Sequence, residues 1–263
     1  MVITLAISNK IRPIILFCLF LLSFLIVLYL PPIPQWDSYH NFADTRSLLK
    51  IPNFANLISN IGFFAVGGFG LAKIYQKGCF ESSIDRVPYL TFFLSVMFIG
   101  MGSSYYHWDP SNASLFWDRL AMTTAFMSFF AAIIADRINR DLGICVILPV
   151  SLIAGIYSLI YWQQTEANGF GDLRFYGMVQ FFPMVAIPLF IWLYRDYRYT
   201  SPKPVLWVFI WYICAKFLEH FDYEVYTLLG EAVSGHTLKH LAATIAIFYI
   251  VKMVTDSNTR VAG

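Results

Sequence analysis

Eight apolar segments joined by short polar connections constrain the fold of this chain more than any other feature of its sequence. A membrane-spanning helix needs about 17–25 mainly apolar residues, because each residue rises about 1.5 Å across about 30 Å of hydrocarbon. The segments that meet this requirement are 13–30, 54–74, 87–106, 115–135, 142–162, 175–194, 205–221 and 236–254. Only 13% of the residues are charged, against about 25% in soluble domains. The sequence therefore predicts an all-α, polytopic membrane helix bundle and excludes a secreted disulfide scaffold, a disordered chain and a nucleic-acid binder.

The connections between these segments are too short for a separate soluble domain, so residues 1–263 are expected to form a single integral-membrane domain. Residues 1–30 supply one additional N-terminal span, and residues 36–254 supply a core of seven helices. The first span ends at Pro31-Pro32-Ile33-Pro34 without a small-residue cleavage site, which favours an uncleaved signal anchor. The sequence does not indicate an oligomeric state.

The positive charges predict the orientation of the bundle, because cytoplasmic loops are enriched in lysine and arginine. One set of span ends carries three such residues, namely Arg46, Lys50 and Arg174. The other set carries twelve, namely Lys10, Arg12, Lys73, Lys77, Arg86, Arg137, Arg140, Arg195, Arg198, Lys203, Lys252 and Arg260. Both termini are therefore expected in the cytoplasm, which in a bacterium implies the inner membrane.

Three polar stretches interrupt the apolar segments at the expected non-cytoplasmic side, where ionisable residues must pair, face a cavity or do chemistry. They are 102–108, 116–119 and 234–240. His236 and His240 are four residues apart, so a helix places both imidazoles on one face. Such a pair can offer two nitrogen ligands to one metal ion, and His107 from another helix would complete a three-nitrogen site.

Three histidine ligands leave one position open on zinc, and zinc lowers the pKa of a bound water to about 7. Asp118 is the carboxylate nearest in depth to these histidines and could accept a proton from that water. Ser103 lies four residues before His107, on the same helical face. Thr237 occupies the position at which the H-E-x-x-H motif of soluble zinc proteases has glutamate, so the general base must come from elsewhere.

The combination of Ser103-x3-His107, Asp118 and His236-x3-His240 resembles the alkaline ceramidase family, within the superfamily that includes adiponectin-type receptors. The strings at 53–60 and 234–240 look like the bacterial branch of that family. The resemblance covers roughly residues 36–254. It implies that His107, His236 and His240 bind zinc, that Asp118 holds and deprotonates the catalytic water, and that Ser103 helps to polarise the substrate carbonyl.

By this resemblance the chain would be an amidohydrolase that cleaves the N-acyl bond of ceramide-type membrane lipids into a sphingoid base and a fatty acid. Animal members also carry a calcium site before their first core helix. The corresponding segment here holds Trp36, Asp37, Asp44 and Asn53, but its spacing departs from the animal pattern, so the expectation of calcium is weak.

Alternative functions remain open at this point. A receptor-like protein or another lipid-amide hydrolase of the same superfamily would keep the same metal. A transporter that uses aspartate and histidine as a proton relay is disfavoured, because the sequence has no internal repeat. Lys216, Glu219, His220 and Asp222 form a second polar group for which an internal ion pair is the preferred interpretation. His40, in the preceding loop, is expected to be solvated or structural.

Overall fold

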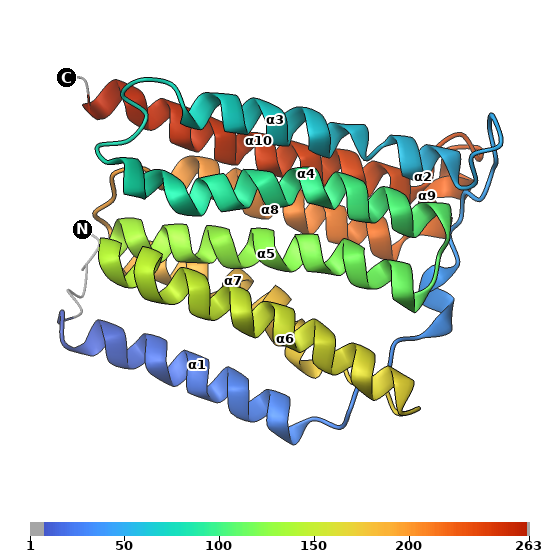
Figure 1. The fold of residues 1–263 in the computed structure, drawn as a ribbon, viewed down its shortest axis with the longest axis horizontal. Coiled ribbons are helices and arrows are strands. Elements are labelled where there is room, and N and C mark those ends of the chain that lie inside the picture. The colour runs from blue at the N-terminus through green and yellow to red at the C-terminus, as the bar shows by residue number, and fades with distance from the viewer. Residues whose placement is uncertain (1–7, 262–263) are drawn as a thin grey trace.

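The computed structural model describes residues 8–261, which form a bundle of long helices that run up and down along one common direction (Figure 1). No β-strand occurs within this range. The helices are α1 (Ile11–Tyr29), α2 (Phe54–Ile58), α3 (Ile61–Ile74), α4 (Val87–Trp108), α5 (Asn112–Arg137), α6 (Leu148–Ala167), α7 (Arg174–Leu193), α8 (Pro202–His220), α9 (Asp222–Leu228) and α10 (Gly235–Val261). Two short 3-10 turns, η1 (Asp37–His40) and η2 (Ser83–Arg86), and one π-helical turn, η3 (Leu142–Ile147), connect or extend them.

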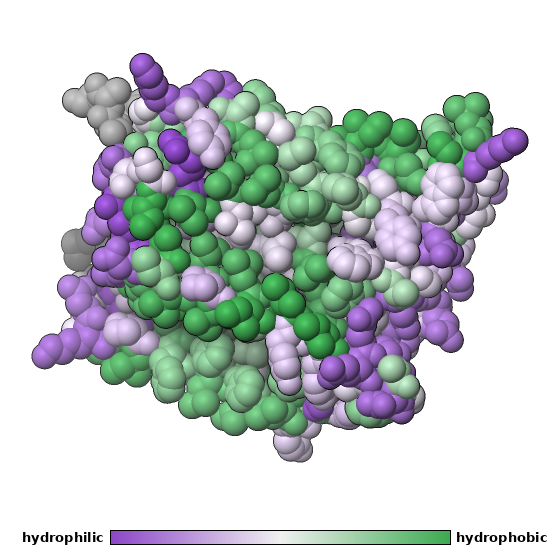
Figure 2. Space-filling view, in the orientation of Figure 1, coloured by the Kyte–Doolittle hydropathy of each residue, from purple (hydrophilic) through white to green (hydrophobic). Residues whose placement is uncertain are grey.

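Seven segments of the described chain are long and apolar enough to cross a membrane, and they match seven of the eight predicted spans. The remaining predicted span, 205–221, corresponds to α8, which qualifies only together with α9, to which it is bent by 83°. Three charged residues, Lys203, Lys216 and Glu219, lie within the 19 residues of α8. Figure 2 shows a hydrophobic surface between two hydrophilic ends. The prediction of an all-α, polytopic membrane bundle is therefore confirmed.

The core is built around α5 and α10. Helix α5 packs against α4, α6 and α7, whereas α10 packs against α3 and α8, and α3 packs against α4. Helix α1 lies outside this core, where it contacts α7 through the rings of Phe20 and Phe182 at 5.7 Å. Val27 is the single buried residue of α1, as expected for a helix that faces lipid. The first seven residues of the predicted N-terminal segment 1–30 lie outside the described residues.

Local hydrogen bonds define where the helices that carry polar residues begin. Ser111 and Ser114 form a reciprocal capping box at the start of α5. At the start of α10, the carboxylate of Asp222 accepts the backbone N–H of His236 at 2.6 Å, and the hydroxyl of Ser234 accepts that of Thr237 at 3.1 Å. These bonds satisfy amide groups that have no partner within the helix, and they fix the position of His236.

The two ends of the bundle differ in what they carry. Helix α1 begins and α10 ends at the same end, on the left in Figure 1. The end of α4, the start of α5 and the start of α10 lie together at the opposite end. The three polar stretches that sequence analysis placed in one layer of the bundle are thus gathered at one end.

Candidate metal centre

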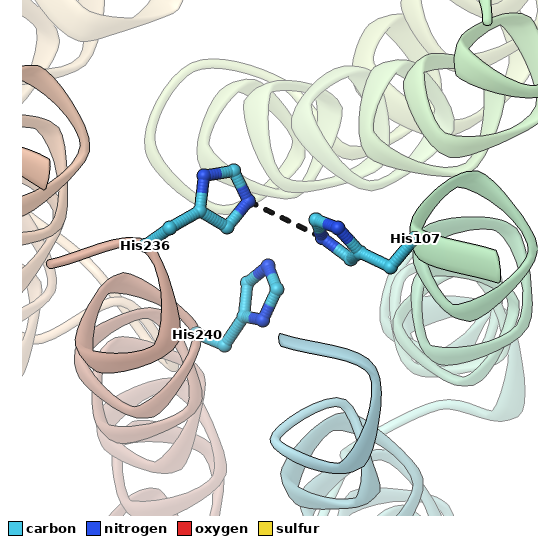
Figure 3. A group of neighbouring side chains, drawn as sticks. All are labelled: His107, His236 and His240. Atoms are coloured by element: carbon cyan, nitrogen blue, oxygen red, sulfur yellow. Dashed lines mark hydrogen bonds between the residues drawn. The ribbon is translucent and has the colours of Figure 1, made fainter. Parts of the chain in front are cut away.

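Three buried histidine side chains meet between the end of α4 and the start of α10 (Figure 3). One ring nitrogen from each of His107, His236 and His240 lies within 4.8 Å of the others, which makes a group that could hold a metal ion. The ring centroids are 4.8 Å apart for His107 and His236, and 5.1 Å apart for each of the other two pairs. The structure thus brings together all three histidines that the sequence predicted as metal ligands.

The donor set suits a divalent transition metal. The Nε2 atoms of His107 and His236 are 3.2 Å apart. Two nitrogens that bind one tetrahedral zinc ion at about 2.0–2.1 Å are separated by about 3.3 Å. The side chains are at most 6% exposed, and three neutral imidazoles are ligands that zinc prefers. Among the described residues, the Nδ1 of His107 has no hydrogen-bond partner. The observed cluster therefore fits a metal site, although it does not identify the ion.

His240 is oriented by a serine that sequence analysis did not select. The hydroxyl of Ser59 lies 2.7 Å from Nδ1 of His240 and donates to the backbone carbonyl of Asn56 at 2.8 Å. A serine hydroxyl has one proton, so both contacts are satisfied only if Nδ1 of His240 carries a hydrogen and donates to Ser59. In that tautomer Nε2 keeps its lone pair, and Figure 3 shows one ring nitrogen of His240 directed between the other two rings.

The position of Ser59 follows from a break in the first core span. Helix α2 ends at Ile58 and α3 begins at Ile61, so Ser59 and Asn60 occupy the junction between them. Both residues are buried, and Ser59 faces the start of α10. The signal in the sequence is the set of polar residues within 53–60, a string that carries part of the family resemblance.

The connection between α1 and α2 covers the histidine cluster. The ring of Phe42 lies 4.7 Å from both His107 and His236, and only 4% of this residue is exposed. The backbone N–H of Ala43 donates to Asp222 at 2.9 Å, the carboxylate that also caps α10. The side chain of Asn53 donates to the carbonyl of His107 at 2.9 Å. The cluster is thus closed on this side by an aromatic ring and by hydrogen bonds between side chains and the main chain.

Ser103 and Asp118, the two predicted catalytic residues, line a cavity of about 160 Å³ inside the bundle together with His240. Ser103 is buried and Asp118 is partly exposed. The carboxylate of Asp118 forms no hydrogen bond within the described residues. From His240 to Ile250 the lining of the cavity follows α10 for ten residues, or about 15 Å. Beyond the polar end the wall is apolar and includes Phe92, Val96, Phe126, Phe129, Phe209 and Ile247.

A second charged cluster borders the same cavity. Glu219 accepts from Lys216 at 2.7 Å and from Lys239 at 2.6 Å. The predicted ion pair between Lys216 and Glu219 is confirmed, and Lys239 joins it from α10. The two other predicted members of this polar group lie elsewhere. His220 is exposed and packs against Phe221, while Asp222 caps α10.

His40 was expected to be either solvated or structural, and the structure gives it a structural role. Its ring nitrogens contact the hydroxyl of Tyr106 at 3.0 Å and the side-chain oxygen of Asn112 at 3.1 Å. These bonds tie the connection between α1 and α2 to the end of α4 and the start of α5.

The residues considered for calcium have other partners. Asp44 accepts two hydrogen bonds from the guanidinium of Arg46, which hold the pKa of its carboxyl below the ordinary value of 3.8. Asn53 is bonded to the carbonyl of His107, and Asp37 lies in the exposed turn η1. The carboxylates of Asp37 and Asp44 do not join any group of three potential ligands among the described residues.

No family model, no curated protein and no solved structure matches this chain. The candidate metal centre is therefore described from its own residues: three buried imidazoles, the serine that orients one of them, and a partly apolar cavity beside them. The chain is a multi-pass membrane protein with a buried histidine cluster that could bind a metal ion.

Proposed function

We propose that this protein is a membrane-embedded, zinc-dependent amidohydrolase that cleaves the N-acyl bond of ceramide-type lipids and releases a sphingoid base and a fatty acid. One observation carries the proposal: a cluster of three histidines lies directly beside an elongated apolar cavity whose polar end contains a carboxylate. A metal site of this kind activates water, and a cavity of this kind binds a lipid chain. The motif resemblance to the alkaline ceramidase family supports the same assignment.

His107, His236 and His240 would hold the zinc ion, and Ser59 would orient His240. When bound, zinc supplies a Lewis acid that polarises the amide carbonyl and makes water available as a nucleophile at neutral pH. The acyl chain of the lipid would lie in the apolar part of the cavity, between α4, α5 and α10. The amide group would then lie near the polar end of the cavity, which is lined by Ser103 and Asp118.

Asp118 would act as the general base and then as the general acid. Its carboxylate takes a proton from the attacking water, so that the remaining oxygen forms a bond to the carbonyl carbon. The same proton then passes to the amide nitrogen as the carbon–nitrogen bond breaks, and the amine leaves in neutral form. The hydroxyl of Ser103 donates a hydrogen bond to the carbonyl oxygen while negative charge develops there.

The charge distribution supports an orientation with both termini in the cytoplasm and the histidine cluster near the non-cytoplasmic surface. The lipid would then reach the cavity from within the bilayer. Cysteine labelling from either side of an intact membrane, at Ser8 and at Lys50, tests this orientation.

The proposed function is tested by measuring zinc content and fatty-acid release from ceramide with the purified protein, before and after chelation. The wild type should contain one zinc ion per chain, and a chelator should abolish turnover. His236→Ala should lose both zinc and activity. His220→Ala is the matched control, because His220 is exposed near the same end of the bundle and lies outside the cluster. Full zinc occupancy in His236→Ala, or turnover that survives complete removal of metal, would overturn the assignment.

A further inference from the structure

The proposed hydrolysis assigns no role to the charged cluster of Lys216, Glu219 and Lys239. Oε2 of Glu219 accepts from Lys216, whereas Oε1 accepts from Lys239 and, at 3.3 Å, from the hydroxyl of Tyr39. Both oxygens of the only carboxylate in this cluster are thus already bonded. Each lysine ammonium has three N–H groups, and the described residues supply a hydrogen-bond acceptor for only one of them.

The cluster faces the cavity beside the histidines. All three of its residues line the cavity that also contains Ser103, Asp118 and His240. Lys239 directly precedes His240 on α10, and Lys216 lies on the neighbouring helix α8. Their side chains are partly buried, with 35% of Lys216 and 17% of Lys239 exposed. A lipid whose amide group reaches Asp118 would therefore bring its polar headgroup close to these ammonium groups.

The groups of this cluster that have no hydrogen-bond partner among the described residues are the remaining N–H donors of the two lysines. Two ammonium groups are bonded to one carboxylate, so the cluster of Lys216, Glu219 and Lys239 by itself carries one positive charge in excess. Asp118 is within electrostatic reach of both lysines but forms no hydrogen bond to them among the described contacts. A neutral hydroxyl group would need acceptors as well as donors. A group with acceptors and negative charge complements the cluster better.

From this arrangement we propose that Lys216 and Lys239 bind an anionic headgroup, so that the preferred substrates are N-acyl lipids with a phosphate, sulfonate or carboxylate group at the polar end. This inference rests on the proposed function, because it names the substrate class of the same site. Glu219 then acts as a positioning residue, since it holds the two ammonium groups side by side at the rim of the cavity.

A binding experiment tests the anion site without depending on turnover. Dodecyl phosphate and dodecanol have the same chain, and their dissociation constants can be measured with metal-free protein in micelles of an uncharged detergent. The wild type should bind dodecyl phosphate at least about tenfold more tightly, which is the ratio expected for one charge-assisted hydrogen bond. Lys216→Met should abolish this difference, whereas Lys216→Arg should keep it.

Lys203→Met is the matched control for general charge effects. Lys203 lies on the same helix as Lys216 but near its other end, is exposed, and does not line the cavity. This variant should keep the full preference for dodecyl phosphate. Equal binding of dodecyl phosphate and dodecanol by the wild type overturns the proposal even if Lys216→Met does not fold. An equal loss of preference in Lys203→Met overturns it as well.

Turnover separates this inference from the proposed function. The zinc-loaded protein is assayed with a neutral ceramide, the corresponding ceramide phosphate and an N-acyl amino acid of the same chain length. Hydrolysis with at least about tenfold higher kcat/KM for the two anionic lipids supports the anion site. Equal hydrolysis of all three lipids overturns the anion site and leaves the proposed function intact. Absence of hydrolysis, with the phosphate preference in binding retained, overturns the proposed function instead.

The binding assay also distinguishes a headgroup from the fatty-acid product. Laurate carries its carboxylate at the end of the acyl chain that hydrolysis would create. If laurate binds as tightly as dodecyl phosphate while turnover shows no headgroup preference, the lysines hold the released acid, and the headgroup assignment is wrong. Weaker binding of laurate, together with preferential turnover of the anionic lipids, supports the headgroup assignment.

Discussion

Replacement of Ser59 by alanine should weaken zinc binding although Ser59 is not itself a metal ligand. The hydroxyl of Ser59 is buried and lies 2.7 Å from Nδ1 of His240. In Ser59→Ala this nitrogen loses its partner, and the ring is no longer held in the tautomer that leaves Nε2 free to bind metal. Loss of such a supporting hydrogen bond lowers metal affinity about 10–100-fold, which corresponds to about 1.4–2.8 kcal/mol.

The cost of leaving a buried polar group without its hydrogen bond gives a similar free energy. A buried polar group that loses its partner costs about 1–3 kcal/mol, and no other side chain among the described residues bonds to Nδ1 of His240. The alanine variant creates no large cavity, because only one oxygen atom is removed. The effect should therefore appear in the zinc dissociation constant more than in the stability of the metal-free protein.

Competition between the purified protein and a fluorescent zinc chelator measures this constant. Ser128→Ala is the matched control, because Ser128 is also buried and its hydroxyl donates at 2.7 Å to the carbonyl of Thr124, remote from the histidines. The control should bind zinc as tightly as the wild type. A zinc dissociation constant for Ser59→Ala within about twofold of the wild type, or an equal weakening in Ser128→Ala, would refute the role assigned to Ser59.

Three further perturbations have definite expected outcomes. Asp118→Asn should retain zinc, measured by elemental analysis, while kcat for amide hydrolysis falls by about 10²–10⁴, because proton transfer is lost; unchanged kcat would contradict its role as general base. Phe42→Ala should lower the unfolding free energy by about 3–5 kcal/mol in a denaturation experiment, because a buried ring is removed beside the histidines; a cost below about 1 kcal/mol would show that Phe42 is not packed there. Asp44 has a lowered pKa in the folded protein, so its contribution to stability is complete above pH 3.8 and is lost as the pH falls through the lowered value. The difference in melting temperature between the wild type and Asp44→Asn should accordingly shrink in acid, and a difference that increased with acidity would be inconsistent with the Arg46 contact.

The sequence was sufficient to predict the helices and the three metal-binding candidates, for two physical reasons. Hydrocarbon thickness sets the length of an apolar span, so the predicted segments agree with the helices to within a few residues at most ends. Histidine is rare inside apolar segments, so His107, His236 and His240 were conspicuous. Their spacing predicted that two of them share one face of a helix, and both point into the cluster.

The surroundings of the cluster were not predictable in the same way. Phe42 lies in an irregular connection without hydrophobic periodicity, and only the path of that connection across the bundle places its ring on the histidines. Ser59 lies at a helix break between α2 and α3, and hydropathy averaged over a window of residues does not reveal such a break. The prediction paired Lys216 with Glu219 because they are neighbours on one helix, but Lys239 joins them from α10, and spacing along a single helix gives no information about such a contact.

The distribution of the three ligands along the chain sets an order on maturation. Helix α4, with His107, is synthesised well before α10, which brings His236 and His240 and is the last helix of the bundle to emerge. Until α10 inserts and packs, His107 lacks the two other histidines of the cluster. Under the proposed function, zinc would therefore bind only after the whole bundle has assembled, and it would stabilise the assembled bundle without initiating its folding.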